Sequence, residues 1–206
     1  GRPALHLSLL ESLLTGRLDG PYIPGAAAAL GLPSGREICY IVAEVNDVGA
    51  EPGAQAEGAG DWKEELVRAA TALTGGRKPL LYEHDEWTAG LLLLSGECLR
   101  PWEELAEALR ASVRLDAGIL RLYVGEPAST PEQIPLSYRS AMHAMACKYA
   151  LDGLPVLTAK DADGAALVRT ELPPELYDRL LHAMEELDVH GAEAALDEMF
   201  DMFRSS

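Results

Sequence analysis

The chain has 206 residues, of which 48% are hydrophobic, enough to bury a core of its own as one α/β domain with helical extensions. Its 33 acidic and 17 basic side chains give a formal net charge of -16. This charge argues against a chain that binds the phosphates of nucleic acids or the head groups of anionic lipids. Apolar runs such as Ala89 to Leu94 are far too short to span a membrane. We therefore expect no direct nucleic acid binding by this chain and no membrane contact.

The cysteines and the two ends of the chain bear on its location. Cys39, Cys98 and Cys147 are scattered without a CxxC pair, which is typical of reduced thiols in a cytoplasmic protein. The start lacks the basic and then apolar pattern of a signal peptide. We expect a cytoplasmic location. The first residue Gly1 and the abrupt end at Ser206 predict that the chain is an excised fragment of a longer protein.

The first predicted elements are helical. Apolar residues fall at helical spacing in the opening segment, and Gly16 ends the run: they are Leu5, Leu9, Leu10, Leu13 and Leu14. A second short helix is expected from about Tyr22 to Leu30. We interpret residues 1–33 as an N-terminal helical extension.

A central strand and a helix follow. Residues from Glu37 to Val45 are apolar on both alternating faces, which predicts a strand covered on both sides. Glycine, proline and acidic residues fill Asn46 to Gly60, as in a flexible loop. Asp61 is predicted to cap the next helix, with Glu64 as its capping-box partner. Its buried stripe comprises Trp62, Leu66, Ala69, Ala70 and Leu73.

The remaining elements complete an alternating pattern. Two strand-like runs flank the polar segment Glu83 to Glu86 and predict a β-hairpin. In chain order, the predicted elements are a strand at Lys78 to Tyr82, a strand at Trp87 to Leu94, a helix opened by Pro101, a strand at Gly118 to Val124, a helix from Thr130-Pro131 and a strand at Leu154 to Leu157.

This order predicts the fold class. Strands that alternate with helices around an antiparallel hairpin indicate an α/β (α+β) fold with a ferredoxin-like mixed sheet flanked by helices. We assign residues 34–160 to this domain. Residues 161–206 are interpreted as a linker and a C-terminal helical hairpin after Pro173-Pro174, hinged near His190-Gly191.

The hairpin segment Tyr82-Glu83-His84-Asp85-Glu86-Trp87 resembles the YGGDEF signature of GGDEF domains. Asp85, Glu86 and the aromatic Trp87 match the signature, whereas Glu83 and His84 replace the two glycines that let a nucleotide approach the backbone. Glu44 falls where the family has its metal-binding acid. The resemblance implies a degenerate domain in which Glu44, Asp85 and Glu86 are vestigial, with no catalytic residue, metal site or cofactor.

A later helix resembles a second signature. The run Ile134 to Ala141, followed by Ala144-Met145, is similar to the "SYxxA" helix of degenerate GGDEF-like domains in PucR/CdaR-type regulators and YesN-type response regulators of the AraC class. The opening "LLESLLTGRL" and the C-terminal helical pair are also similar to the YesN middle region. That family implies a receiver domain and an AraC-type DNA-binding domain in the same full-length protein.

The resemblance implies a non-catalytic sensory or signal-transmission domain of a two-component response regulator that controls transcription, acting as a homodimer. Two alternatives stay open. One is a nucleotide cyclase of the diguanylate cyclase type, in which Glu44, Asp85 and Glu86 would hold Mg²⁺. The other is a module that binds a small effector molecule in a pocket beside its tryptophans, unless these are core residues: Trp62, Trp87 and Trp102.

Two further patterns carry weaker chemistry. His143 and Cys147 stand four residues apart, the spacing of two metal ligands or of a nucleophile and its base. With no third partner, the alternative is a core-facing thiol beside a histidine. The run Asp161 to Gly164 begins like a calcium loop but lacks the later ligands, so we predict a tight turn there.

Overall fold

The secondary structure follows the predicted succession of strands and helices. In a computed structural model, the described residues are 2–33, 35–46, 62–95, 101–115, 118–149, 151, 153–167, 174–185 and 188–205. Their helices and strands are α1 Arg2–Leu14, α2 Ile23–Ala29, β1 Ile38–Asn46, α3 Trp62–Leu73, β2 Leu80–Glu83, β3 Thr88–Leu94, α4 Trp102–Ser112, β4 Ile119–Val124, α5 Ile134–Ala146, β5 Val156–Thr158, α6 Ala159–Leu167, α7 Pro174–Glu185 and α8 Val189–Ser205. Short 3-10 helices are η1 Gly20–Tyr22, η2 Pro131–Gln133 and η3 Cys147–Tyr149.

One mixed sheet organises the fold. Its five strands have the order β2-β3-β1-β4-β5. β1 is antiparallel to both β3 and β4, while β4 and β5 are parallel. The predicted central strand is confirmed and begins and ends one residue later than expected. The fold class, an α+β mixed sheet flanked by helices, is confirmed as well.

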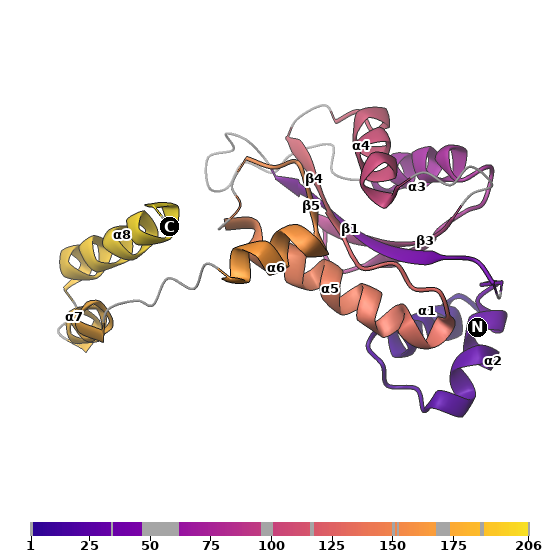
Figure 1. The fold of residues 1–206 in the computed structure, drawn as a ribbon, viewed down its shortest axis with the longest axis horizontal. Coiled ribbons are helices and arrows are strands. Elements are labelled where there is room, and N and C mark those ends of the chain that lie inside the picture. The colour runs from indigo at the N-terminus through magenta and orange to yellow at the C-terminus, as the bar shows by residue number, and fades with distance from the viewer. Residues whose placement is uncertain are drawn as a thin grey trace.

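Helices cover both faces of the sheet (Figure 1). Because side chains of a strand alternate, β1 sends one set toward α3 and α4, including Cys39 and Ile41, and the other set toward α1 and α5, including Tyr40 and Val42. The first set packs with apolar residues of α3 and α4: Trp62, Leu66, Ala70, Trp102, Leu105 and Leu109. Each face of the sheet therefore has its own hydrophobic core.

The N-terminal helices pack against the core on the α5 face of the sheet, the one that contains Tyr40 and Val42. Leu13 and Leu14 of α1 are fully buried there, next to Ile134 of α5. At the other end of the chain, α7 and α8 pack on each other, and Arg179 pairs with Glu198 at 2.8 Å across them. Apolar side chains of these two helices that stay exposed are Leu181, Met184, Val189, Leu196 and Phe200.

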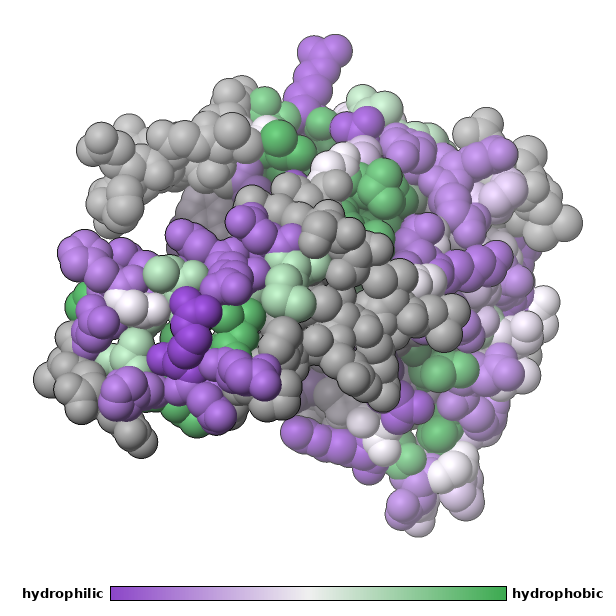
Figure 2. Space-filling view, turned by 60° about the vertical axis from the view of Figure 1, so that its left-hand side comes forward, coloured by the Kyte–Doolittle hydropathy of each residue, from purple (hydrophilic) through white to green (hydrophobic). Residues whose placement is uncertain are grey.

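Among the described residues, no helix is both long and apolar enough to cross a membrane. Over the described parts of the face in Figure 2, hydrophilic residues predominate and hydrophobic ones form small, separate groups. This distribution agrees with the large excess of acidic side chains in the sequence.

Two local predictions are wrong. The run Asp161 to Gly164 is helical and belongs to α6, because Thr158 and Asp161 form a capping box: the Thr158 amide donates to Asp161 Oδ2 at 2.8 Å, and the Asp161 amide donates to Thr158 Oγ1 at 3.2 Å. The hinge predicted at His190-Gly191 lies inside α8, which Asp188 caps by accepting the Gly191 amide at 3.1 Å.

Three other features lie outside the described residues. They are the loop after Asn46 up to Gly60, the helix cap Asp61, and Cys98.

Candidate functional site

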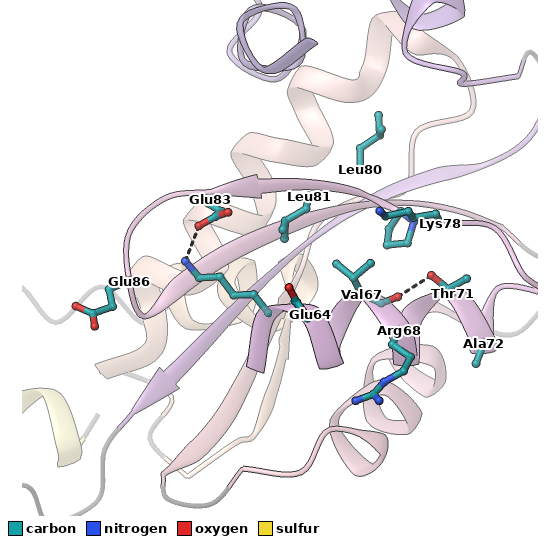
Figure 3. A pocket seen from close by; sticks show the side chains of 12 residues that line it. Glu64, Val67, Arg68, Thr71, Ala72, Lys78, Leu80, Leu81, Glu83 and Glu86 are labelled. Atoms are coloured by element: carbon teal, nitrogen blue, oxygen red, sulfur yellow. Dashed lines mark hydrogen bonds and ion pairs between the residues drawn. The ribbon is translucent and has the colours of Figure 1, made fainter. Parts of the chain in front are cut away.

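The turn between β2 and β3 is fastened to helix α3. The Lys63 ammonium donates to Glu83 Oε2 at 2.9 Å and to the Asp85 carbonyl oxygen at 2.7 Å. The Lys63 side chain is 14% exposed, so most of its length is removed from water. Figure 3 shows the Glu83 carboxylate turned toward this ammonium. One lysine therefore holds both the strand end and the turn, and this role had no signal in the sequence.

His84 turns inward and joins an aromatic cluster. Its Nε2 lies 3.0 Å from the hydroxyl of Tyr40, and its ring is stacked with Tyr138 at 6.2 Å between centroids. Tyr82 meets the same ring edge-on at 4.9 Å. Burial lowers the pKa of His84, although the neighbouring Asp85 opposes this effect. The neutral form of His84 is therefore favoured. Its imidazole ring occupies the position where the YGGDEF signature has its second glycine.

The space for Tyr40 depends on Gly90 of β3. A Cβ at Gly90 would lie 1.7 Å from the Tyr40 hydroxyl oxygen, a severe overlap. Burial raises the pKa of Tyr40 far above its usual range, so the phenol stays protonated. Because Gly90 has no side chain, the Tyr40 ring can lie over β3 and its hydroxyl can reach His84.

Sheet pairing brings Glu44 close to the hairpin backbone. Glu44 lies opposite Thr88, and the Val45 amide donates to the Trp87 carbonyl oxygen at 2.9 Å. The Glu44 carboxylate, however, is buried and already has two partners: it accepts from the Tyr123 hydroxyl at 2.6 Å and pairs with the Lys148 ammonium. The carboxylate placed by resemblance at a metal-binding position is occupied by protein groups.

The two acidic residues of the turn face water. Asp85 and Glu86 are both exposed, and Asp85 Oδ1 accepts the Trp87 amide at 2.8 Å, which closes the turn. The described residues contain no group of three or more His, Cys, Asp or Glu side chains that could hold a metal ion. Glu44, Asp85 and Glu86 therefore do not form such a group.

The "SYxxA" helix has a clear structural role. Ser137 of α5 is fully buried, and its Oγ accepts the backbone amide of Tyr40 at 2.9 Å. This amide needs a partner because the chain leaves β4 at Gly125 and rejoins β1 only at Ala128. A Cβ at Gly125 would lie 2.1 Å from the Ser137 carbonyl oxygen, so this approach requires glycine. Ser137 thus fills a gap in the sheet.

The other candidate residues do not form a site. His143 is exposed, whereas Cys147 is half-buried against the α5 core, so the two do not share one environment. Trp62 and Trp102 are buried beneath α3 and α4, and Trp87 packs on the same core. These placements agree with the core interpretation of the tryptophans.

A groove of about 1270 Å³ lies between α3 and β2 (Figure 3). Its lining does not include the tryptophans. It is formed by Lys63, Glu64, Val67, Arg68, Thr71 and Ala72 of α3 and by Lys78, Pro79, Leu80, Leu81, Glu83 and Glu86 of the hairpin. The groove begins at the signature turn and follows the outer strand.

Comparisons with known proteins bear on the fold and the family. Residues 15–147 match the model of the GGDEF-like domain family, which is more than half of the chain. The fold is similar to the crystal structure of a regulator of polyketide synthase expression from Bifidobacterium adolescentis, with a TM-score of 0.52 and 17% sequence identity over 98% of this chain and 85% of that chain. No protein with a curated description matches the chain by sequence. The chain belongs to the GGDEF-like domain family.

Proposed function

We propose that this chain is a non-catalytic sensory or signal-transmission domain of a cytoplasmic regulator of transcription. The observation that carries the proposal is the state of the signature turn. Glu83 and His84 fill both glycine positions, and both side chains are held, one by Lys63 and the other by Tyr40. A phosphate chain would have to displace these contacts before it could approach the backbone.

The position of the Glu44 carboxylate supports the same proposal. A metal ion that used Glu44 would compete with the Lys148 ammonium and the Tyr123 hydroxyl. These partners fix the carboxylate in a buried site, where removing a lysine counter-charge is costly. A regulatory role is also supported by the likeness in fold to a protein described as a regulator of polyketide synthase expression.

Helix α5 offers a route for a signal. Ser137 and Tyr138 tie it to β1 and to His84 of the turn, and Lys148 ties the segment just after it to Glu44. A displacement of the turn or of β1 would therefore move α5 as a unit, and α6 packs against α5. In the proposed full-length protein, a homodimer of the YesN or PucR/CdaR type, this movement would change the spacing of the AraC-type DNA-binding domains, under control of a receiver domain.

The catalytic alternative is separated by a turnover assay. The purified chain is incubated with GTP and Mg²⁺, and dinucleotide and pyrophosphate are measured, with the same mixture plus EDTA as the control. We expect no turnover and no thermal stabilisation by GTP, since a ligand that binds the native state raises its stability. Sustained, Mg²⁺-dependent turnover would refute the proposal in favour of a cyclase.

The regulatory context is separated by a gel shift and by the gene. The chain alone should not shift promoter DNA, because its charge of -16 opposes phosphate contacts. Coding sequence for a receiver upstream and for a helix-turn-helix downstream would support the response-regulator assignment. A gene that encodes neither would contradict it.

A further inference from the structure

The two edges of the sheet differ in how they are protected. β5 has three residues and follows Pro155, and its Thr158 amide is already bonded to Asp161. A proline, a short strand and backbone amides that are already hydrogen-bonded all hinder the pairing of an edge strand with another strand. β2 is the opposite edge, and within the part of the chain that the structure describes no strand pairs with its outer side. The edge at β2 is therefore the open one.

The hairpin register fixes which backbone groups point outward from β2. The His84 amide donates to the Thr88 carbonyl oxygen at 3.1 Å, and bonded pairs alternate along an antiparallel ladder. Leu80 and Tyr82 therefore bond inward to β3, opposite Leu92 and Gly90. The N–H and C=O groups of Leu81 and Glu83 point outward, together with the carbonyl group of Pro79.

Charge also distinguishes the two edges. The groove beside β2 is lined by three basic side chains, Lys63, Arg68 and Lys78, and by three acidic ones, Glu64, Glu83 and Glu86. The hollow beside β5 has four acidic side chains and one basic side chain, namely Glu103, Glu104, Glu107, Asp161 and Lys160. Two copies of a chain with a net charge of -16 repel each other. The balanced groove beside β2 is where they can approach with less repulsion than at the acidic β5 edge.

We propose that β2 pairs with β2 of a second copy of this chain, antiparallel across a two-fold axis at Leu81. This register places Leu81 opposite its own counterpart, so their N–H and C=O groups bond reciprocally, and the Glu83 amide meets the Pro79 carbonyl of the other copy. The two sheets then form one continuous sheet. The inference rests on the homodimer of the proposed function and identifies its contact surface.

The charge pattern along β2 favours a second copy over a foreign peptide. Lys78 lies two residues before β2 and Glu83 at its end, and Figure 3 shows the two at opposite ends of the groove. A two-fold axis through Leu81 brings the basic end of one copy to the acidic end of the other. The complementary charges are thus encoded in the chain itself, while apolar Val67 and Leu81 between them lose water on pairing.

Self-association is tested with a matched pair of variants. Leu81 and Val156 are both half-buried, both pack on the α3 and α4 core, and each lies in an edge strand beside a hollow. Leu81→Lys and Val156→Lys place the same charge at opposite edges. By sedimentation equilibrium, we expect the wild-type chain and V156K to dimerise at about 0.1 mM, and L81K to associate at least about tenfold more weakly. A wild-type chain that is monomeric at about 1 mM overturns the proposal and leaves the groove to a foreign peptide or small molecule.

A cross-link makes the test independent of the stability of L81K. Bonded residues of an antiparallel pair have Cα atoms about 5.5 Å apart, within the range that a disulfide spans. Leu81→Cys treated with diamide, which takes up the two electrons and two protons of the thiols, should form a covalent dimer. Val156→Cys and the wild-type chain are the controls, because both report any cross-link through the native thiols, of which Cys39 is buried and Cys147 half-buried. Equal cross-linking of L81C and V156C, or an L81K dimer as strong as wild type, would place the interface elsewhere. Neither result depends on nucleotide turnover, so failure here removes this contact surface and leaves the non-catalytic role of the proposed function standing.

Discussion

The two faces of strand β1 are stabilised in different ways. Toward α3 and α4, the strand presents Cys39, Ile41, Ala43 and Val45, and the neighbouring core is almost entirely apolar. Toward α5, the same strand presents Tyr40 and Glu44 beside Val42, and both polar side chains have specific partners. One face depends on close packing, whereas the other depends on directed polar contacts.

This difference teaches where the domain can respond to a signal. Apolar packing is tolerant of direction, since it depends mainly on the area removed from water. Polar contacts hold only in one geometry and leave costly orphan groups when they break. The polar contacts link β1 with the signature turn and α5. A displacement of the turn would therefore break or shift contacts on the α5 face, whereas the apolar packing on the α3 and α4 face would be retained.

The largest expected loss comes from the apolar face. Leu66 of α3 is fully buried, so Leu66→Ala should lower the free energy of unfolding by about 4 kcal/mol through lost burial and a cavity. Denaturant unfolding followed by circular dichroism measures the loss. The exposed Leu7 provides the control, with an expected change within about 0.5 kcal/mol for Leu7→Ala. A loss below about 1 kcal/mol at Leu66 would contradict the packing account.

A substitution on the polar face should lower stability less, and a second substitution should restore part of the loss. Lys148→Met leaves the buried Glu44 carboxylate without its counter-charge and should lower stability by about 3 kcal/mol. Adding Glu44→Gln removes the unpaired charge, so the double variant should regain more than half of the loss. A double-mutant cycle measures this coupling. Strictly additive losses would show that the two residues are independent and would remove the distinction between the faces.

The sheet gap that Ser137 fills gives the next effect. Ser137→Ala leaves the buried Tyr40 amide without an acceptor and should lower stability by about 2 kcal/mol. Hydrogen exchange at the Tyr40 amide should accelerate at the same time. Ser140→Ala is the matched control, because Ser140 accepts the exposed Glu126 amide one turn along the same helix. If the Tyr40 amide exchanges at the same rate in both variants, the Ser137 hydroxyl is not the acceptor that protects it.

Much of the fold could be predicted because local patterns and tertiary contacts agree. The unbroken apolar run of β1 and the polar turn between two leucine-rich strands both indicated their places in the sheet. Prediction failed where a short motif had two interpretations. Asp161 with Gly164 looks like a turn, but buried Ala159 and Ala162 and the capping box with Thr158 favour a helix.

The candidate site could be predicted only in part. The replacement of both turn glycines was visible in the sequence, and so was the segment containing Ser137. The partners were not, because Glu44 and Lys148 are 104 positions apart and Tyr40 and His84 are 44 apart. Pairing at such separations is set by the sheet register and by the path of α5. A lone lysine carries no local signal of a distant carboxylate.

The smallest expected effect is a pH dependence at His84. Burial lowers the pKa of His84 in the folded state below its unfolded value of about 6.5, so protonation favours unfolding. The stability that His84 contributes is therefore complete above pH 6.5, falls as the pH drops through 6.5, and levels off below the folded pKa. His84→Gln should flatten the stability profile between pH 7 and 5, whereas His143→Gln, at an exposed position, should leave its slope unchanged. A wild-type profile that rises on acidification through this window would mean that the imidazolium, and not the neutral ring, is the form the aromatic cluster binds.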